Sequence, residues 1–461
     1  MADVSEIISE LNSVLNEPVA PVVASVEPVA PVSLVAPVSL VAPVSLVAPV
    51  APVVEPKNVK ILIVSTHVNQ SNGYSKVIYN IIKQLASHKW IKIIHFGTQQ
   101  IVSGNIGRVY PSNVKVIDAT SMEKTKQDGF AFIELPGMIQ SEKPDVVFIY
   151  NDMVVTCRYV EEIHKVIQNR FFRIWSYLDI TYKNPPLHLI DILNKGIERI
   201  FCFTQSWKDE LKMHGITRPV DVMNHGLDKG IRPIPKELAR QTLGLPKDVT
   251  LFTSLNKNIP RKRLDIIIIA FVKLIIKFPV KPLFMLIVAD NGKRGGFNLF
   301  DIFSREIKQA GESIDMFGNR LLITSKDTCY KDEDINMLYN SGDIGISCAE
   351  GEGFGLCTFE QMSLGIPQIV PNINGYSEYC NKDNSIMIDP FFHYYIPQSY
   401  NTVTGEAYMV NPEDVSKAME KYTFDENLRK LHGKLGKEKI SEYTWDKCCS
   451  LLIKRLTTME E

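Results

Sequence analysis

The most informative stretch of the sequence is EGEGFGLCTFEQMSLGIP, residues 350–367, because it joins two different hydrophobic periodicities. The short apolar run before it, at 343–347, is typical of a buried strand. Residues 356–364 after its loop have helical spacing, and Gly365 and Pro367 end that helix, since glycine accepts a left-handed conformation and proline cannot continue a helix. The order strand, loop, helix predicts one unit of an α/β fold.

The same alternation extends outward from this unit in two blocks. The first block has short β-branched runs at 59–65, 91–97, 114–118, 145–150, 172–178 and 199–204. The second has them at 250–255, 283–288, 321–324, 344–347, 367–370 and 385–389. Longer helical patterns separate the runs, so we predict two doubly wound, Rossmann-like α/β domains. Ligands bind outside the carboxyl ends of such strands, and the two domains should therefore frame one cleft.

A chain of 461 residues is long enough for these two domains and further segments. We predict the following division: an amphipathic helix at 1–17, a Pro/Val/Ala repeat tether at 18–56, an N-terminal Rossmann-like domain at 57–228, a linker at 229–245, a C-terminal Rossmann-like domain at 246–435, and a terminal helix at 436–461.

The first 56 residues differ in amino-acid composition from the rest of the chain. Residues 29–46 are three copies of VAPVSL, and no acid or base lies between Glu27 and Glu55. A transmembrane helix is excluded because each repeat has a proline, which costs about 3 kcal/mol in a helix interior. A signal peptide is excluded because the segment lacks a basic start. We expect residues 18–56 to form a disordered tether. The helix before the tether is either a handle for docking to a protein partner or for oligomerisation, or a frayed terminus without a function.

The overall charge is balanced, with 51 basic and 52 acidic side chains. This balance argues against a nucleic-acid partner, which would call for a strong basic excess. The eight cysteines form no C-x-x-C pair and have no histidine at zinc-ligand spacing. We therefore expect a reduced, cytoplasmic protein without a metal site.

The loop and helix at 350–367 suit a ligand that carries both phosphate and hydroxyl groups. Glycines let the backbone approach a ligand, and a helix N-terminus offers unpaired N–H groups to an anion. Glu352 and Glu360 would accept hydrogen bonds from hydroxyls on either side. Their spacing alone means little, since this acid content gives about 6 such pairs by chance. A sugar nucleotide has this layout of hydroxyls and phosphates.

The Glu-x7-Glu pattern with an internal GFGL, followed by a helix and G-x-P, resembles the retaining glycosyltransferases of family 4, which have the GT-B fold. The resemblance covers about residues 59–456. It implies a nucleoside-diphosphate sugar as donor, a glycan, lipid-linked or protein acceptor, and neither a metal nor another cofactor. It also implies that the N-terminal domain holds the acceptor, that the C-terminal domain holds the sugar nucleotide, and that the terminal helix returns to the first domain. It places Glu352 on the donor sugar, Glu360 on the ribose, and Gly353, Phe354, Gly355 and Leu356 beside the sugar and diphosphate.

A basic segment, SLNKNIPRKRLDIIIIAF at 254–271, follows the first strand of the second block. A departing nucleoside diphosphate gains negative charge, which cations must stabilise. Lys257 and Lys262 match the Arg/Lys pair of the family, with lysine in place of arginine at the first position. Arg261 is adjacent, so either Arg261 or Lys262 supplies the second cation.

The first domain offers weaker matches. The loop STHVNQSNGYSKVIYN, residues 65–80, resembles the family's glycine-rich loop but has only Gly73, which we place with Tyr74 near the diphosphate. Either Asp152 or Asp179, each predicted to follow a strand, would polarise the acceptor hydroxyl.

Three further features are interpreted as structural. His225 lies in a turn before the linker, the acids at 332–334 suit the start of a helix, and Trp445 would anchor the terminal helix on the first domain.

The sequence thus predicts transfer of a sugar to an acceptor hydroxyl with retained configuration. Two alternatives are a non-catalytic sugar-nucleotide or glycan-binding module presented on the tether, and a phosphorylase of similar architecture. The sequence is also compatible with a peripheral contact between the protein and a membrane.

Overall fold

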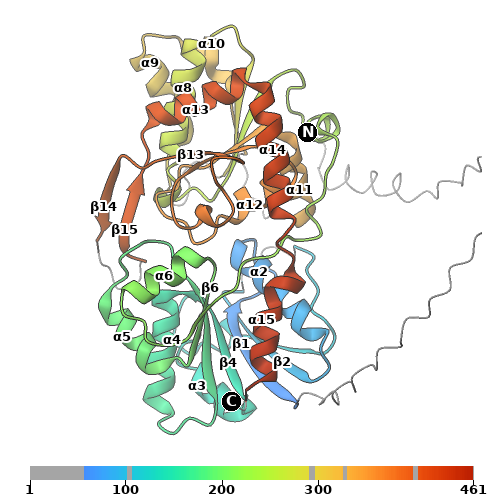
Figure 1. Ribbon diagram of the computed structural model, residues 1–461, viewed down its shortest axis with the longest axis vertical. Helices are drawn as coiled ribbons and strands as arrows, with labels where there is room; N and C mark the ends of the chain where they lie inside the picture. Colours follow the sequence, from blue (N-terminus) through green and yellow to red (C-terminus); the bar gives the residue numbers. More distant parts are fainter. Residues whose placement is uncertain (1–56, 101–105, 290–295, 325–329, 398–402, 460–461) are drawn as a thin grey trace, which may run out of the picture. The chain divides into compact units, whose positions relative to one another are not determined.

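The computed structural model describes residues 57–100, 106–289, 296–324, 330–397 and 403–459 (Figure 1). The described residues from Asn58 onward form one compact unit. The helix predicted for 1–17 and the tether predicted for 18–56 lie outside the described residues.

The N-terminal lobe is built on a seven-stranded parallel sheet with the order β3-β2-β1-β4-β5-β6-β7. Its strands are β1 (Val59–Thr66), β2 (Ile91–Thr98), β3 (Val114–Asp118), β4 (Val146–Asp152), β5 (Arg173–Asp179), β6 (Arg199–Cys202) and β7 (Val220–Val222). The strand order reverses between β1 and β4, which opens a crevice at their carboxyl ends.

The C-terminal lobe repeats this plan in a six-stranded parallel sheet with the order β10-β9-β8-β11-β12-β13. Its strands are β8 (Thr250–Leu255), β9 (Leu283–Val288), β10 (Leu321–Ile323), β11 (Ile344–Ile346), β12 (Gln368–Pro371) and β13 (Ile386–Ile388). Here the order reverses between β8 and β11, the strands that precede the basic segment and the glycine loop. Both predicted Rossmann-like sheets are confirmed.

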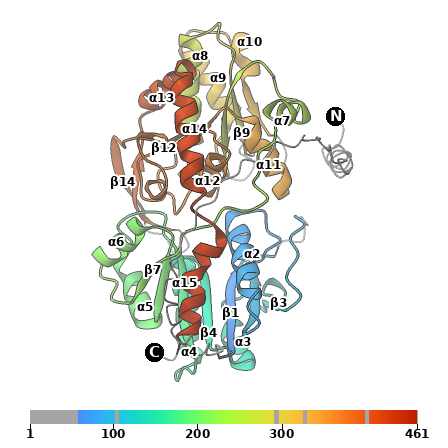
Figure 2. The same cartoon turned by 45° about the vertical axis from the view of Figure 1, so that its right-hand side comes forward.

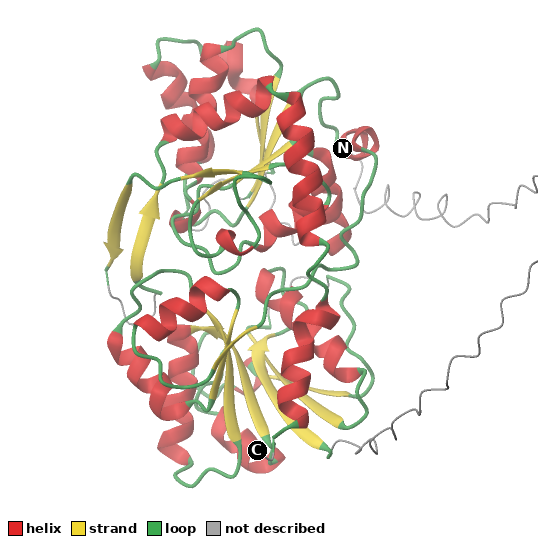
Figure 3. Cartoon of the chain, in the orientation of Figure 1, coloured by secondary structure: helices red, strands yellow, loops and turns green. Residues whose placement is uncertain are grey.

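Helices cover the sheets (Figure 3). Those that follow the first strands are α2 (Gly73–Ala86), α3 (Leu135–Glu142), α4 (Met153–Val166), α5 (Leu187–Gly196), α6 (Gln205–Met213) and α7 (Lys236–Thr242). Then come α8 (Leu264–Lys277), α9 (Leu299–Gln309), α10 (Ile314–Phe317), α11 (Asp332–Ser341), α12 (Leu356–Ser363), α13 (Pro412–Phe424), α14 (Glu426–Ile440) and α15 (Trp445–Thr457). Short 3-10 turns span Thr120–Met122, Pro260–Lys262, Gly318–Arg320 and Tyr376–Glu378.

The central strands are continuous apolar runs because helices cover both faces of a parallel sheet. In β4 every residue from Val146 to Asn151 is buried. Three strands are absent from the predicted series. β7 has only three residues, and the antiparallel hairpin of β14 (Phe392–Ile396) and β15 (Gly405–Met409) has partly exposed, mixed side chains. The segment predicted as linker also contains α7, which packs on α11.

Helix α15 lies beside α2 on the N-terminal lobe, as Figure 2 shows. Its buried residues share one apolar cluster with Phe354 and Phe359 of the C-terminal lobe. Trp445 is buried against Gly226, where a Cβ atom would lie 2.4 Å from the Trp445 backbone nitrogen. This close approach fixes the turn before the second lobe against the first turn of α15.

Candidate active site

The glycine loop after β11 leads into α12 through a left-handed residue. Gly355 is the N-cap of α12 with φ of 85°, and a Cβ atom there would lie 2.4 Å from the Tyr376 ring. A Cβ atom on Gly353 would lie 2.0 Å from Asp179 Oδ1 on the N-terminal lobe. The loop therefore needs glycine at both positions, for conformation at one and for a close approach at the other.

Glu352 lies in this loop between two cations. Its Oε2 atom accepts a hydrogen bond from Lys262 Nζ and lies 3.4 Å from Arg261 Nη1. Arg261 also donates to the carbonyl of Gly351 at 2.6 Å. Burial alone would raise the pKa of Glu352, but Lys262 and Arg261 together hold it below its usual value of 4.5. The carboxylate is therefore charged, and both cations are in place beside the N-terminus of α12.

Glu360, on the buried face of α12, pairs with a cation from the other lobe. Its Oε1 atom lies 2.6 Å from Lys76 Nζ, and its Oε2 atom accepts a hydrogen bond from the Tyr339 hydroxyl at 3.0 Å. Both side chains of the ion pair are less than a tenth exposed. Burial opposes a charge on Lys76, but Glu360 and Asp332 outweigh it and raise the pKa of the ammonium group.

Lys76 is in the first turn of α2, which the sequence placed near the diphosphate through Gly73. A Cβ atom on Gly73 would make ordinary contact with Leu356 Cδ2 at 3.6 Å, so the starts of α2 and α12 adjoin. Asn72 caps α2 by accepting a hydrogen bond from Ser75 N at 2.9 Å. Two helix N-termini therefore face the same region of the site.

Asp332 forms a second ionic contact between the lobes. It begins α11, as the sequence predicted for the acids at 332–334. Both of its oxygens accept hydrogen bonds from Arg108, at 2.9 and 2.8 Å. Arg108 also donates to Ser75 Oγ in α2 at 2.8 Å. Burial would raise the pKa of Asp332, but Arg108 and Lys76 lower it below 3.8.

The two candidate aspartates of the first domain have different environments. Asp152 caps α4 by accepting a hydrogen bond from Val155 N at 2.9 Å. Asp179, at the end of β5, accepts a hydrogen bond from the Tyr74 hydroxyl at 2.5 Å. Its Oδ1 atom is buried and has no hydrogen-bond partner among the described residues. Burial raises the pKa of Asp179 to about 6, although Tyr74 and Arg261 favour its charged form.

The remaining sequence-predicted residues lie nearby or in the core. Lys257 is exposed on the loop after β8. Phe354 is buried, and its ring centroid is 4.6 Å from that of His225. His225 contacts the Tyr177 hydroxyl through Nδ1 at 2.7 Å, and burial lowers its pKa to about 3. A neutral, enclosed imidazole of this kind is structural.

The structure thus brings together Glu352, Arg261 and Lys262 at the loop before α12, and it places Glu360 within α12. Sequence reasoning did not select Lys76 or Arg108. Lys76 stands three residues after Gly73 in the quoted loop, but nothing in the sequence indicates that α2 would direct it across the lobes. Within the described residues no group of three or more His, Cys, Asp or Glu side chains is placed to hold a metal ion.

Known structures share this architecture. A glycosyltransferase from Rickettsia africae aligns over 88% of this chain and 99% of its own, with 14% identity and a TM-score of 0.63. Sucrose-phosphate synthase from Thermosynechococcus elongatus aligns over 87% and 98%, with 13% identity and a TM-score of 0.64. Anabaena HepE in complex with UDP-glucose aligns over 87% and 100%, with 14% identity and a TM-score of 0.62.

This chain has the GT-B fold. At these identities the likeness shows the fold alone. No protein-family model matches the sequence, and a comparison with curated proteins gives no match. The activity must therefore be argued from the site. Across the described ranges, no helix is both long enough and apolar enough to cross a membrane.

Proposed function

We propose that this protein is a glycosyltransferase that moves a sugar from a nucleoside-diphosphate sugar to an acceptor hydroxyl, in the manner of the retaining family 4 enzymes that its motif resembles. One observation carries the proposal. Glu352 and Glu360 stand at the two ends of one loop–helix unit, and each is paired with cations beside the N-terminus of α12.

The donor would replace these ion pairs. Its ribose hydroxyls would be held by Glu360, its sugar hydroxyls by Glu352, and its diphosphate would lie between them at the start of α12. Lys76, Arg261 and Lys262 would then exchange a carboxylate partner for a phosphate. The carboxylates hold the cations in place before the donor arrives, so little reorganisation is needed when it binds.

The chemical step follows from this placement. The bond between the anomeric carbon and the β-phosphate oxygen breaks, and the acceptor oxygen forms a bond to the same face of that carbon. The acceptor proton passes to the departing phosphate. Arg261, Lys262 and the helix terminus stabilise the charge that gathers on the diphosphate. No metal is required for this, because side chains supply the positive charge.

Asp179 is the aspartate that we propose to orient the acceptor hydroxyl. Its Oδ1 atom is unpartnered among the described residues and adjoins Gly353, whereas Asp152 is occupied as a helix cap. The Tyr74 hydroxyl fixes the other oxygen of Asp179. An acceptor hydroxyl that donates to Oδ1 would satisfy the buried atom.

The donor class has independent support from the GT-B neighbours, one of which was solved with UDP-glucose.

A thermal-shift screen of nucleoside-diphosphate sugars tests donor binding. A ligand that binds only the folded chain stabilises it by RT ln(1 + [L]/Kd), so at least one donor should raise Tm in a concentration-dependent way. The same donor should have a smaller effect on Glu360→Gln. A panel in which no donor raises Tm would contradict the proposal.

A further inference from the structure

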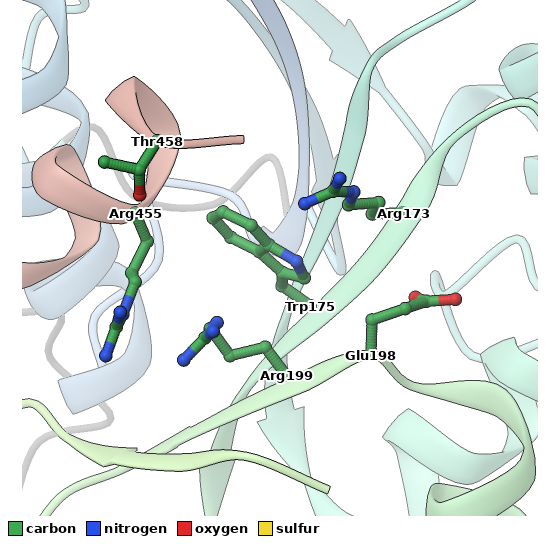
Figure 4. Close-up of a pocket in the computed structure, with 6 residues that line it drawn as sticks. All are labelled: Arg173, Trp175, Glu198, Arg199, Arg455 and Thr458. Carbon is green, nitrogen blue, oxygen red and sulfur yellow. The ribbon is translucent and has the colours of Figure 1, made fainter. Parts of the chain in front are cut away.

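A cavity of about 430 Å³ lies at the amino edge of the N-terminal sheet, beside the last turn of α15 (Figure 4). We refer to it as the arginine cavity; it is lined by Arg173, Trp175, Glu198, Arg199, Arg455 and Thr458. It is separate from the candidate active site. β5 runs from Arg173 in this cavity to Asp179 in the candidate active site, and six residues of strand span about 20 Å.

The position of the arginine cavity follows from strand geometry. Arg173 and Trp175 are two residues apart on β5, so they share one face of the sheet. Trp175 is opposite Arg199 on β6, which brings a second arginine to the same place. α15, whose buried residues share an apolar cluster with Trp175, ends at Thr457 beside this cavity. Arg455 in the last turn of α15 completes the lining.

Positive charge exceeds negative charge in the arginine cavity. Arg199 and Arg455 share a single carboxylate, that of Asp221, at 2.6 and 3.0 Å. Glu198 is paired with Arg170 at 2.8 Å. Arg173 has no ion-pair partner among the described residues and is exposed. Among the described residues that line the arginine cavity, three arginines therefore stand against one carboxylate.

Hydrogen-bond donors are also in excess. Figure 4 shows the Trp175 ring between the guanidinium groups of Arg455 and Arg173. The indole N–H of Trp175 has no acceptor among the described residues. Guanidinium groups present paired N–H donors that match the oxygens of a phosphate, and an indole N–H adds one more donor.

We propose that the arginine cavity is a binding site for a phosphate monoester dianion, distinct from the donor site in the cleft. The described lining carries more positive than negative charge, as the binding of such a group requires. Arg173 is its principal ligand, because this guanidinium has no carboxylate to give up. The phosphate belongs either to a small metabolite or to a lipid headgroup, and the two sources share the chemistry that the cavity recognises.

The test follows a signal from the arginine cavity itself, because phosphate would also enter the cleft. The full chain is labelled with 5-fluorotryptophan for fluorine NMR, and the resonance of Trp175 is assigned as the one that is absent from the spectrum of Trp175→Phe. Inorganic phosphate and glycerol 3-phosphate are then titrated. We expect a saturable shift of the Trp175 resonance in the wild type. In Arg173→Ala the phosphate concentration at the midpoint of the titration should rise by roughly tenfold, and in Arg173→Glu no shift should occur. Arg305→Ala, an exposed arginine on α9, is the control and should behave as wild type.

A second arm identifies the source. Vesicles of phosphatidylcholine with and without phosphatidic acid are sedimented with the wild type and with Arg173→Glu. Retention by phosphatidic acid that Arg173→Glu abolishes indicates a lipid headgroup, whereas a Trp175 shift with soluble phosphates alone indicates a metabolite. The proposal is wrong if neither phosphate shifts the Trp175 resonance and the vesicles with phosphatidic acid do not retain the protein. It is also wrong if Arg173→Glu responds as the wild type does.

Discussion

Lys76 is the residue that most changes the view of the site taken from the sequence. It reaches from α2 to the carboxylate that the motif assigns to the ribose, and the pair is buried. A buried ion pair is a poor source of net stability, because desolvation of both charges offsets their attraction. We therefore interpret Lys76 as a cation held ready for the donor.

Replacement of Lys76 tests this explanation. In Lys76→Met we expect the Kd for the donor diphosphate to rise by about tenfold or more, since a charge-assisted hydrogen bond is lost. Lys76→Arg should recover part of the affinity. Isothermal titration measures both, with Lys83→Met on the exposed face of α2 as control.

The same variant leaves Glu360 buried without its cation and should lower stability. The double variant Lys76→Met/Glu360→Gln removes that charge and should restore Tm without restoring donor affinity. If the double variant instead bound the donor as tightly as wild type, Lys76 would be a purely structural residue.

Asp179 gives a prediction about pH. Its pKa in the folded chain, about 6, is above the ordinary 3.8, so the folded chain binds this proton more tightly than the unfolded chain does. Its contribution to stability is therefore greatest below 3.8 and is lost as the pH rises to about 6. Asp179→Asn removes the titration. We compare the unfolding free energies of wild type and Asp179→Asn, measured in urea. The wild-type value minus the variant value should fall as the pH rises from 3.8 to about 6 and stay constant above pH 6.

At the scale of elements, the strand–loop–helix unit from β11 to α12 depends on its glycines. Gly353→Ala would place a Cβ atom 2.0 Å from Asp179 Oδ1, well inside van der Waals contact. We expect a loss of Tm and of transfer activity. Gly137→Ala in α3, where the added Cβ meets nothing within 4 Å, should leave both unchanged or raise Tm. Equal behaviour of the two variants would show that the loop is not closely packed on Asp179.

The elements that could be predicted from sequence are those with strong local signals. Both strand series were visible because fully covered parallel strands are continuous apolar runs, and α12 was visible from Gly365 and Pro367. β14 was missed because three of its five residues are exposed, and β15 was missed because its short sequence, GEAYM, is neither a continuous apolar run nor rich in β-branched residues. Lys76 and Arg108 were missed for another reason: their partners are more than 200 residues away in sequence, and only the packing of the lobes brings them together.

At the scale of the whole molecule, the described residues from Asn58 onward contain both sheets and one apolar cluster that spans the lobes. The repeat segment, predicted as a tether, should therefore contribute nothing to the fold. A chain that lacks residues 1–56 should keep the Tm and the donor affinity of the full protein, as measured by calorimetry and titration. A drop in Tm would show that this segment packs on the lobes.

The most direct test of the central claim is release of nucleoside diphosphate from a panel of nucleotide sugars, with and without candidate acceptors. The account predicts that at least one donor is consumed, that an acceptor accelerates the release, and that Glu352→Gln and Lys262→Ala reduce it by about tenfold or more. Glu312→Gln, far from the site in sequence and exposed, should release as wild type does. Donor binding without release from any member of the panel, or equal release by the site variants, would contradict the account and favour a non-catalytic binding protein.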